Sequence, residues 1–290
     1  MMIVLWLALG LIVSYGLLIW LFQDRLIYVP TTTFPEVAAG AQAVGAQRFS
    51  FRCADADQIA WLLPPAPQAD RVLVIACIGN AGCAAMWLED PAYLLPQLHG
   101  RLGAAILAVD YPGYGACPGR PSPEAILLQT RAAQAAALTH LGWDRSTVQF
   151  AVIGMSLGTG VASQHAVAEG INRLALISPY TSLLDMARLR QPWPFWHLLR
   201  HRFDNRASIA TIAGRGACRV QIWHGDDDQI IPVAHSRQLA AAFAGVVAYR
   251  EVAGAGHDDV IAVDLPCSLE ELVQVCVGPL ITGLDHANKR

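Results

Sequence analysis

The sequence predicts an α/β domain in which a mostly parallel sheet of eight strands is flanked by helices. Short apolar runs alternate with helix-like stretches along most of the chain, which is typical of strand–helix–strand units. The run at residues 72–77 is apolar at every position, as expected for a central strand that is covered on both faces. Reactive residue types directly follow three such runs, and open α/β sheets place their chemistry at these carboxyl ends of strands.

The elements are predicted in order from the pattern of apolar runs. Two early antiparallel strands are expected at residues 46–53 and 58–63, because a short polar turn joins two strand-like runs. The other strands are predicted at residues 72–77, 104–109, 148–153, 173–177, 219–223 and 246–252. Helices are predicted at residues 91–101, 121–141, 159–168 and 234–243.

The N-terminal segment, residues 1–22, carries no charged side chain. At about 1.5 Å per helical residue, it is long enough to cross a hydrocarbon core of about 30 Å. We therefore expect a membrane-spanning anchor at residues 1–22, a connector at residues 23–45 and one α/β domain at residues 46–290. The protein is accordingly expected in a membrane, held by a single N-terminal anchor.

A cleaved signal peptide and a buried helix are the alternatives to this anchor. A signal peptide should have a basic residue before a shorter apolar region and a small-residue cleavage site soon after it. Here the first basic residue is Arg25, and the small-residue cluster at residues 38–43 lies far downstream. The anchor is the favoured interpretation, but Arg25 beside Asp24 leaves its orientation undecided under the positive-inside rule.

Composition excludes several classes of function. The net charge of −3 gives no basic footprint for nucleic-acid binding. The 7 cysteines show no C-x-x-C spacing, so neither a metal site nor a disulfide framework is expected, and pairing of Cys267 with Cys276 stays a minor alternative. Apolar residues reach 54% and charged residues only 15%, which fits one large core together with a membrane segment.

Ser156 lies at the centre of a G-x-S-x-G motif formed with Gly154 and Gly158. The motif follows the predicted strand at 148–153 and precedes the predicted helix at 159–168. Strand, sharp turn and helix is the setting in which this motif forms a nucleophile elbow. Glycines are needed there because the turn is strained and its neighbours pack closely. Ser156 is therefore the candidate nucleophile.

An acid and a histidine follow Ser156 in the required order. A serine hydroxyl is a weak nucleophile unless a base removes its proton. His257 is the candidate base, because it directly follows the last predicted strand, and Asp228 is the candidate acid that orients it. Asp226 and Asp227 remain alternatives for the acid. The chain order Ser–Asp–His differs from the orders found in chymotrypsin and subtilisin.

Further stretches make the chain similar to a known family. Residues 78–82 (I-G-N-A-G) resemble an H-G-N-A-G oxyanion loop, and residues 110–115 (D-Y-P-G-Y-G) resemble a D-Y-R-G-Y-G loop. Residues 224–232 match H-G-x-x-D-x-x-[VI]-P, and residues 256–258 match G-H-D. Together with the anchor, these motifs resemble the membrane-anchored esterase, thioesterase and monoacylglycerol-lipase-like group of the α/β-hydrolase superfamily.

Two positions depart from this family pattern. Ile78 stands where the family usually has His, and Pro112 stands where Arg is common. Because the oxyanion donor is a backbone N–H, Ile78 is compatible with activity, although it removes the usual side-chain hydrogen bonds of the loop. The resemblance implies an α/β-hydrolase fold with an oxyanion hole formed by the backbone N–H groups of Leu157 and Asn80. It implies no metal and no other cofactor.

Residues 182–213 interrupt the alternation of strands and helices. In the α/β-hydrolase fold, an insertion at this place usually forms a short cap over the active site. The segment holds five arginines beside Trp193, Phe195 and Trp196. These aromatic side chains are expected either to pack on the body, or to line an acyl pocket or touch lipid headgroups as substrate-binding residues.

The sequence thus predicts a membrane-anchored serine hydrolase that cleaves carboxylic esters or thioesters with apolar acyl groups through an acyl-enzyme intermediate. Its expected partners are a small-molecule or lipid-like acyl ester and the lipid bilayer, and not nucleic acid. An aminopeptidase or amidase on the same fold is the enzymatic alternative. A catalytically inactive, membrane-tethered interaction domain is the third; the glycines around Ser156 argue against it, because a scaffold needs no strained elbow.

Overall fold

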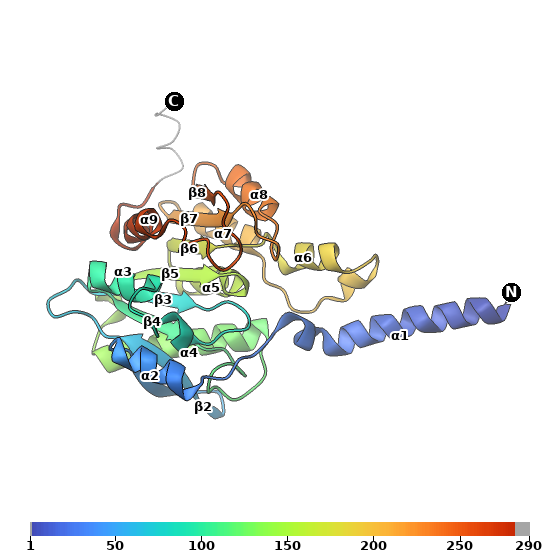
Figure 1. Ribbon diagram of the computed structural model, residues 1–290, viewed down its shortest axis with the longest axis horizontal. Coiled ribbons are helices and arrows are strands. Elements are labelled where there is room, and N and C mark those ends of the chain that lie inside the picture. The colour runs from blue at the N-terminus through green and yellow to red at the C-terminus, as the bar shows by residue number, and fades with distance from the viewer. Residues whose placement is uncertain (1, 282–290) are drawn as a thin grey trace.

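The computed structural model describes residues 2–281, which are organised around one sheet of eight strands (Figure 1). The strands are β1 (Gln47–Cys53), β2 (Ala56–Leu63), β3 (Val72–Cys77), β4 (Ala105–Val109), β5 (Gln149–Met155), β6 (Arg173–Ile177), β7 (Arg219–Gly225) and β8 (Val247–Val252). The helices are α1 (Met2–Ile27), α2 (Pro35–Ala43), α3 (Leu94–Leu102), α4 (Pro123–Leu141), α5 (Leu157–Glu169), α6 (Leu183–Arg190), α7 (Asn205–Gly214), α8 (Ala234–Ala242) and α9 (Leu265–Val277).

The strand order is β1-β2-β4-β3-β5-β6-β7-β8. The pairs β1–β2 and β2–β4 are antiparallel, and every later pair is parallel. The sheet is therefore mixed, with an antiparallel edge added to the parallel part that the alternation of strands and helices predicts. In the sheet, β4 lies on one side of β3 and β5 lies on the other side. Because β3 and β5 are parallel neighbours, their carboxyl ends lie side by side.

Helices cover both faces of the sheet. The helices α4, α5 and α7 pack together on one face, and α3 packs against α9 on the other. The central strands β3 and β4 are buried at every position, as their uninterrupted apolar sequences require. The edge strand β1 instead alternates toward its end between exposed and buried residues. Burial on both faces fixes the strand ends that carry the site.

The helix α1 extends away from the body of the molecule (Figure 1). Among the described residues it is the one helix long and apolar enough to cross a membrane, so it is a candidate anchor. Large apolar side chains such as Trp6 and Leu11 are exposed along it. The helix continues to Ile27, beyond the end at residue 22 that the absence of charge predicts.

Two helices outside the predicted insertion at residues 182–213 were not expected from the sequence. The connector at residues 23–45 contains α2, which begins at Pro35 with Glu36 in its first turn. Proline at the first helical position followed by an acid is a helix-start signal, because proline has no N–H that would be left without an intrahelical acceptor and the acid complements the helix dipole. The second is α9, whose residues Leu269, Leu272 and Val275 are buried against the sheet.

The predicted cap at residues 182–213 divides into two parts. The helix α7 belongs to the body, because it packs against α5 and because Asn205 Nδ2 donates to the carbonyl of Tyr180 at 2.8 Å. The part outside the body is shorter and consists of α6, the single turn η3 (Phe195–Leu198) and their connections. This outer part packs against α1.

Candidate active site

Ser156 stands at a sharp turn between β5 and α5. Its φ of 53° lies in the left-handed region, which is unusual for a residue with a side chain and marks a strained position. A Cβ on Gly158 would meet the carbonyl oxygens of Cys77 and Ile78, and a Cβ on Gly154 would meet the backbone of Gly158. Both glycines of the motif are thus required by close backbone packing, and the turn has the geometry of a nucleophile elbow.

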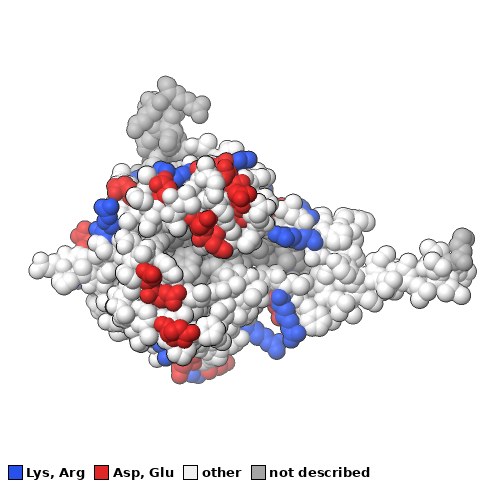
Figure 2. All heavy atoms as spheres, viewed as in Figure 1, with Lys and Arg blue, Asp and Glu red and all other residues white. Residues whose placement is uncertain are grey.

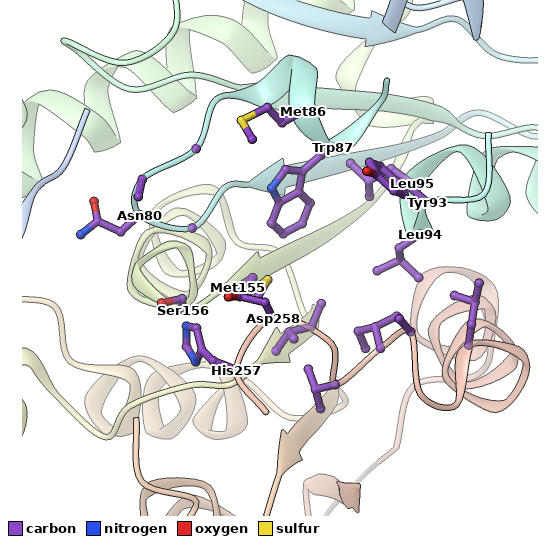
Figure 3. Close-up of a pocket in the computed structure, with 18 of the residues that line it drawn as sticks. Asn80, Met86, Trp87, Tyr93, Leu94, Leu95, Met155, Ser156, His257 and Asp258 are labelled. Atoms are coloured by element: carbon purple, nitrogen blue, oxygen red, sulfur yellow. The ribbon is translucent and has the colours of Figure 1, made fainter. Parts of the chain in front are cut away.

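The structure brings His257 and Asp228 together from the ends of two neighbouring strands. Asp228 follows β7 and His257 follows β8, and His257 Nδ1 lies 2.7 Å from Asp228 Oδ2. His257 and Ser156 both line one cavity, and Figure 3 shows the imidazole ring directly beside the Ser156 side chain. Since Nδ1 is held by the carboxylate, Nε2 is the ring nitrogen available to the serine.

The carboxylate of Asp228 is held in its ionised form. Its Oδ1 accepts the backbone N–H groups of Ile230 and Ile231, each at 2.8 Å. Burial alone would raise the pKa of Asp228, but hydrogen bonds from His224, His257 and the Ile231 N–H outweigh it and hold the pKa well below its usual range. The carboxylate therefore remains charged at neutral pH and can fix the tautomer of His257.

His224 is a further residue of the site, to which the sequence analysis gave no role. Its fully buried ring places Nε2 3.1 Å from Asp228 Oδ2, and Nδ1 lies 2.6 Å from Ser236 Oγ. A hydroxyl that donates to Nδ1 leaves the proton on Nε2, so that His224 donates to the carboxylate. The sequence contained one indication of this role, because His224 is the first residue of the H-G-x-x-D motif that ends at Asp228.

The neighbouring acids do not approach His257 in this way. Asp226 Oδ1 accepts the N–H of Gly254 at 2.7 Å, and Asp227 Oδ1 accepts from Gln229 at 2.8 Å. Both carboxylates are exposed, whereas Asp228 is buried. Of the three candidate acids, Asp228 is the one that the fold brings to the histidine.

The two residues predicted to supply oxyanion donors lie in segments next to Ser156. Leu157 is the first residue of α5, and the N–H groups in the first turn of a helix have no intrahelical acceptor. Asn80 belongs to the loop that follows β3, and it lines the same cavity as Ser156. The next residue, Ala81, has a φ of 55°, so this loop is also strained. The positions of Leu157 and Asn80 fit those of two oxyanion donors.

The side chain of Asn80 ties this loop to the residues that follow α1. Its Oδ1 accepts the N–H of Val29 at 2.8 Å and the hydroxyl of Tyr114 at 2.7 Å, and its Nδ2 donates to the carbonyl of Ile27 at 2.7 Å. The backbone adds a bond from the Ala81 N–H to the Val29 carbonyl at 3.1 Å. The end of α1 therefore holds the loop in place.

We expect Asn80→Ala to lower kcat about tenfold with little change in KM, because the backbone donor remains but loses the contacts that aim it. Removing an oxyanion donor outright costs about 10²–10³ in kcat, so a misaligned donor should cost less. Tyr114→Phe, which removes one of the three side-chain contacts, should give a smaller loss of the same kind. Steady-state kinetics check this; a raised KM with unchanged kcat would assign Asn80 to substrate binding instead.

Other contacts hold the loop at Ile78, where the family usually has a histidine. The Ile78 side chain is fully buried in the core, and its carbonyl accepts the hydroxyl of Tyr111 at 2.7 Å. Asp110, from the same loop as Tyr111, accepts the N–H of Ala84 at 2.7 Å. Burial raises the pKa of Asp110 to about 6. The two loops are thus held together without the usual histidine.

The cavity beside Ser156 has a volume of about 750 Å³ and a largely apolar lining. One wall consists of residues that come after the Asn80 loop in the sequence, and the other consists of residues after His257 together with Ile230 from the loop after β7, so that segments far apart in the sequence enclose the space (Figure 3). The apolar side chains of the two walls are those of Met86, Trp87, Tyr93, Leu94 and Leu95, and of Ile230, Val260, Ile261 and Leu265. The cavity is therefore large enough and apolar enough for an acyl chain.

The aromatic residues expected to bind substrate are not part of this wall. Trp193, Phe195 and Trp196 are absent from the residues that line the cavity. The ring of Phe195 packs edge-on against Tyr15 of α1, and Trp193 is 76% exposed. The assignment of these three side chains to an acyl pocket is corrected accordingly, because the outer part of the insertion leans on α1 instead of covering Ser156.

The cysteines form no disulfide in the described residues. All seven are free, and six of them are buried. Cys267 and Cys276, the pair left open by the sequence, both lie in α9, and only Cys267 is exposed.

Comparisons with known proteins agree with this fold. The sequence profile of the alpha/beta hydrolase family matches residues 72–213. An uncharacterized protein of Mycobacterium tuberculosis is 36% identical over 83% of this chain and 82% of its own length. An alpha-beta hydrolase from Vibrio vulnificus aligns with a TM-score of 0.67 at 15% identity, over 88% of this chain and 92% of the other. The Pyrococcus furiosus esterase Pf2001 aligns with a TM-score of 0.63 at 15% identity, over 86% of this chain and 94% of the other.

Proposed function

Because the chain belongs to the alpha/beta hydrolase superfamily, we propose that it is a membrane-anchored serine hydrolase that cleaves carboxylic esters or thioesters with apolar acyl groups. The observation that carries this proposal is the meeting of Ser156 with the His257–Asp228 pair at an apolar cavity. The esterase among the similar structures is compatible with such a substrate.

The reaction begins at Ser156. His257 Nε2 takes the proton of the hydroxyl as Oγ attacks the acyl carbonyl, and Asp228 stabilises the imidazolium that forms. The negative charge that develops on the carbonyl oxygen is stabilised by the N–H groups of Leu157 and Asn80. These donors are fixed before the reaction, by the start of α5 and by the contacts of the Asn80 side chain, so little reorganisation is needed.

The second half of the reaction regenerates the serine. His257 returns its proton to the leaving alcohol or thiol, and the acyl group remains on Ser156 Oγ. A water molecule then gives a proton to His257 and attacks the acyl carbon, and His257 passes that proton to Ser156 Oγ as the C–Oγ bond breaks and the acid is released. Every step uses side chains and backbone N–H groups of this chain.

The acyl chain is assigned to the walls of the cavity. Trp87, Tyr93 and Leu94 on one side and Ile261 and Leu265 on the other offer apolar surface next to Ser156. Burial of one CH₂ group contributes about 0.8 kcal/mol. Acyl chains that extend along these walls should therefore be favoured over acetyl.

A series of p-nitrophenyl esters tests this assignment with the full-length enzyme in detergent. We expect kcat/KM to rise about two- to fourfold per added carbon from acetyl to medium-chain esters, until the cavity is full. Trp87→Ala should flatten this rise, because it removes an indole from the wall, and should change acetyl ester turnover by less than about threefold.

Trp193→Ala is the matched control for Trp87→Ala, since it also removes an indole but lies outside the cavity. It should leave the chain-length trend unchanged. A flattened trend in Trp193→Ala with a normal trend in Trp87→Ala would return the acyl site to the insertion. A preference of the wild-type enzyme for acetyl or aminoacyl substrates would favour the aminopeptidase or amidase alternative.

Anchoring is proposed for α1. The helix is 26 residues long, and its apolar side chains are exposed almost throughout the first half. A soluble protein rarely exposes so large an apolar surface, because water contact with it is unfavourable. A bilayer would cover it, and the catalytic body would be held at the membrane surface, within reach of substrates that are dissolved in the lipid.

A further inference from the structure

The segment formed by residues 186–203 runs alongside the second half of α1. Gln23 Nε2 donates to the carbonyl of Leu198 at 3.3 Å, and Gln23 Oε1 accepts the N–H of Arg200 at 2.6 Å. The guanidinium of Arg200 lies 4.7 Å from the centroid of the Trp20 ring. These contacts fix one end of the segment beside the body-proximal end of α1.

The contacts continue further out along the helix. Tyr15 Oη donates to Gln191 Oε1 at 2.8 Å, and the rings of Tyr15 and Phe195 pack edge to face with centroids 4.7 Å apart. A Cβ on Gly16 would lie only 3.1 Å from the Phe195 ring, so the small residue allows close approach. The tip of the segment at residues 192–196 therefore lies toward the N-terminal half of α1, away from the body (Figure 1).

Counting along α1 gives the depth of this tip in a membrane. A hydrocarbon core of about 30 Å takes about 20 helical residues at about 1.5 Å each. The charged residues Asp24 and Arg25 mark the body-proximal end of such a span, whose uncharged run ends at Phe22. Tyr15 comes seven residues earlier and would lie roughly 10 Å inside the core. The tip that contacts Tyr15 must then reach a similar depth, which is typical of interfacial elements that do not cross the bilayer.

The composition of the segment suits that depth. Its tip, residues 192–196, is P-W-P-F-W, and Trp193 is 76% exposed. Residues 186–203 contain no acidic residue, but Asp185 and Asp204 directly flank them, and Arg188 Nη1 lies 3.0 Å from Asp185 Oδ1. The four arginines of the segment, at positions 188, 190, 200 and 202, are all exposed. Basic side chains gather where the body meets α1 (Figure 2). The apolar tip is suited to contact the acyl chains of a bilayer, and the arginines on either side of it are suited to contact the phosphate groups above those chains.

We propose that residues 186–203 form a membrane wedge, a second lipid-inserting element that places Trp193 among the acyl chains of the near leaflet and its arginines against anionic phospholipid headgroups. This rests on the proposed anchoring by α1. A helix alone leaves the body free to rotate about its axis, and the wedge removes this freedom, because it adds a second point of insertion beside the first.

The wedge also sets the position of the cavity relative to the bilayer. Arg190 Nη2 donates to the carbonyl of Ile230, which lines the cavity, at 3.0 Å. On the opposite wall, Asn80 donates to the carbonyl of Ile27 at the end of α1. Both membrane-facing elements thus bond directly to cavity residues, and the cavity is held next to the lipid surface.

Fluorescence quenching in liposomes tests the wedge with the full chain. Cys267 is the one exposed cysteine, so Cys267→Ser provides a background for single labels. An environment-sensitive label is attached at Trp193→Cys, at Leu5→Cys in α1, and at Leu128→Cys, which is 51% exposed on α4 and serves as the matched body control. The liposomes contain phosphatidylcholine and phosphatidylglycerol, with nitroxide quenchers placed either shallow or deep in the acyl chains.

We expect the label at position 193 to be quenched at least about twofold more strongly by the shallow nitroxide than the label at position 128. The label at position 5 should be quenched by the nitroxides in the lipid when α1 spans the bilayer. Equal, weak quenching at positions 193 and 128 with strong quenching at position 5 would overturn the wedge and leave the anchor intact. Weak quenching at all three positions would overturn both.

The arginines are tested by lipid charge. Replacing phosphatidylglycerol with phosphatidylcholine should reduce the quenching at position 193 but not at position 5, because the arginines lose their anionic partners. In a variant with Arg188→Gln, Arg190→Gln, Arg200→Gln and Arg202→Gln, this dependence on lipid charge should vanish. Quenching at position 193 that ignores lipid charge with all four arginines present would overturn the headgroup contact.

Discussion

Ser156→Ala should lower kcat for ester hydrolysis by about five to six orders of magnitude, because residues that act as a unit in a triad fail together when the nucleophile is lost. The elbow places the Ser156 hydroxyl beside His257, and no other serine lines the cavity in the described part of the chain. Alanine at this position keeps the backbone of the turn, so the far-ultraviolet circular dichroism should match that of the wild type.

Ser163→Ala is the matched control. Ser163 lies on the same helix, α5, and is fully buried, but it does not line the cavity. Its replacement should change kcat by less than about threefold, as expected for a residue that is not part of the reacting unit. Ester hydrolysis by Ser156→Ala within tenfold of the wild type would refute the assignment of the nucleophile.

Asp228→Asn should lower kcat about 10⁴-fold with the fold retained. The amide can still accept the N–H groups of Ile230 and Ile231 through its oxygen, which directs the NH₂ group toward His257 Nδ1. An N–H donor at that place forces the proton of the imidazole onto Nε2, so the ring can no longer take the proton of Ser156. Pre-steady-state and steady-state kinetics on a soluble ester check this loss.

Asp227→Asn is the same substitution one position earlier, at an exposed carboxylate that bonds to Gln229. It should alter kcat by less than about threefold, in keeping with a surface substitution. If Asp227→Asn were the crippling change and Asp228→Asn were mild, the acid would be reassigned while the roles of Ser156 and His257 would stand.

Ser156, Asp228 and His257 could be predicted from short motifs, because each of them lies in a turn that directly follows a predicted strand. A serine between two glycines, after an apolar run and before a helix-like stretch, is the setting of a nucleophile elbow, and the acid and the histidine follow strands whose ends meet at one edge. The hydrogen bond between Asp228 and His257 agrees with that prediction. His224 was harder to assign, because its role depends on a ring that points back toward the carboxylate from inside the core.

The acyl wall could not be predicted, because it forms only by tertiary packing. Trp87 and Tyr93 come from the region after β3, whereas Ile261 comes shortly before α9 and Leu265 is its first residue, so these two pairs are more than 160 residues apart. No periodicity links them. The contact of the aromatic insertion with α1 could not be predicted for the same reason: Tyr15 lies 176 residues from Gln191, and nothing in the local sequence indicates that contact.

The central claim is that Ser156 is an activated nucleophile, and the most direct measurement is the site of covalent labelling by a fluorophosphonate. The probe reacts with serines that a neighbouring base has activated. Incubation of the full-length protein followed by peptide mass spectrometry should find one adduct, on Ser156, and labelling should disappear in His257→Ala, in which the serine remains but its base is gone. An adduct on another residue, or no adduct on a folded wild-type protein, would contradict the account.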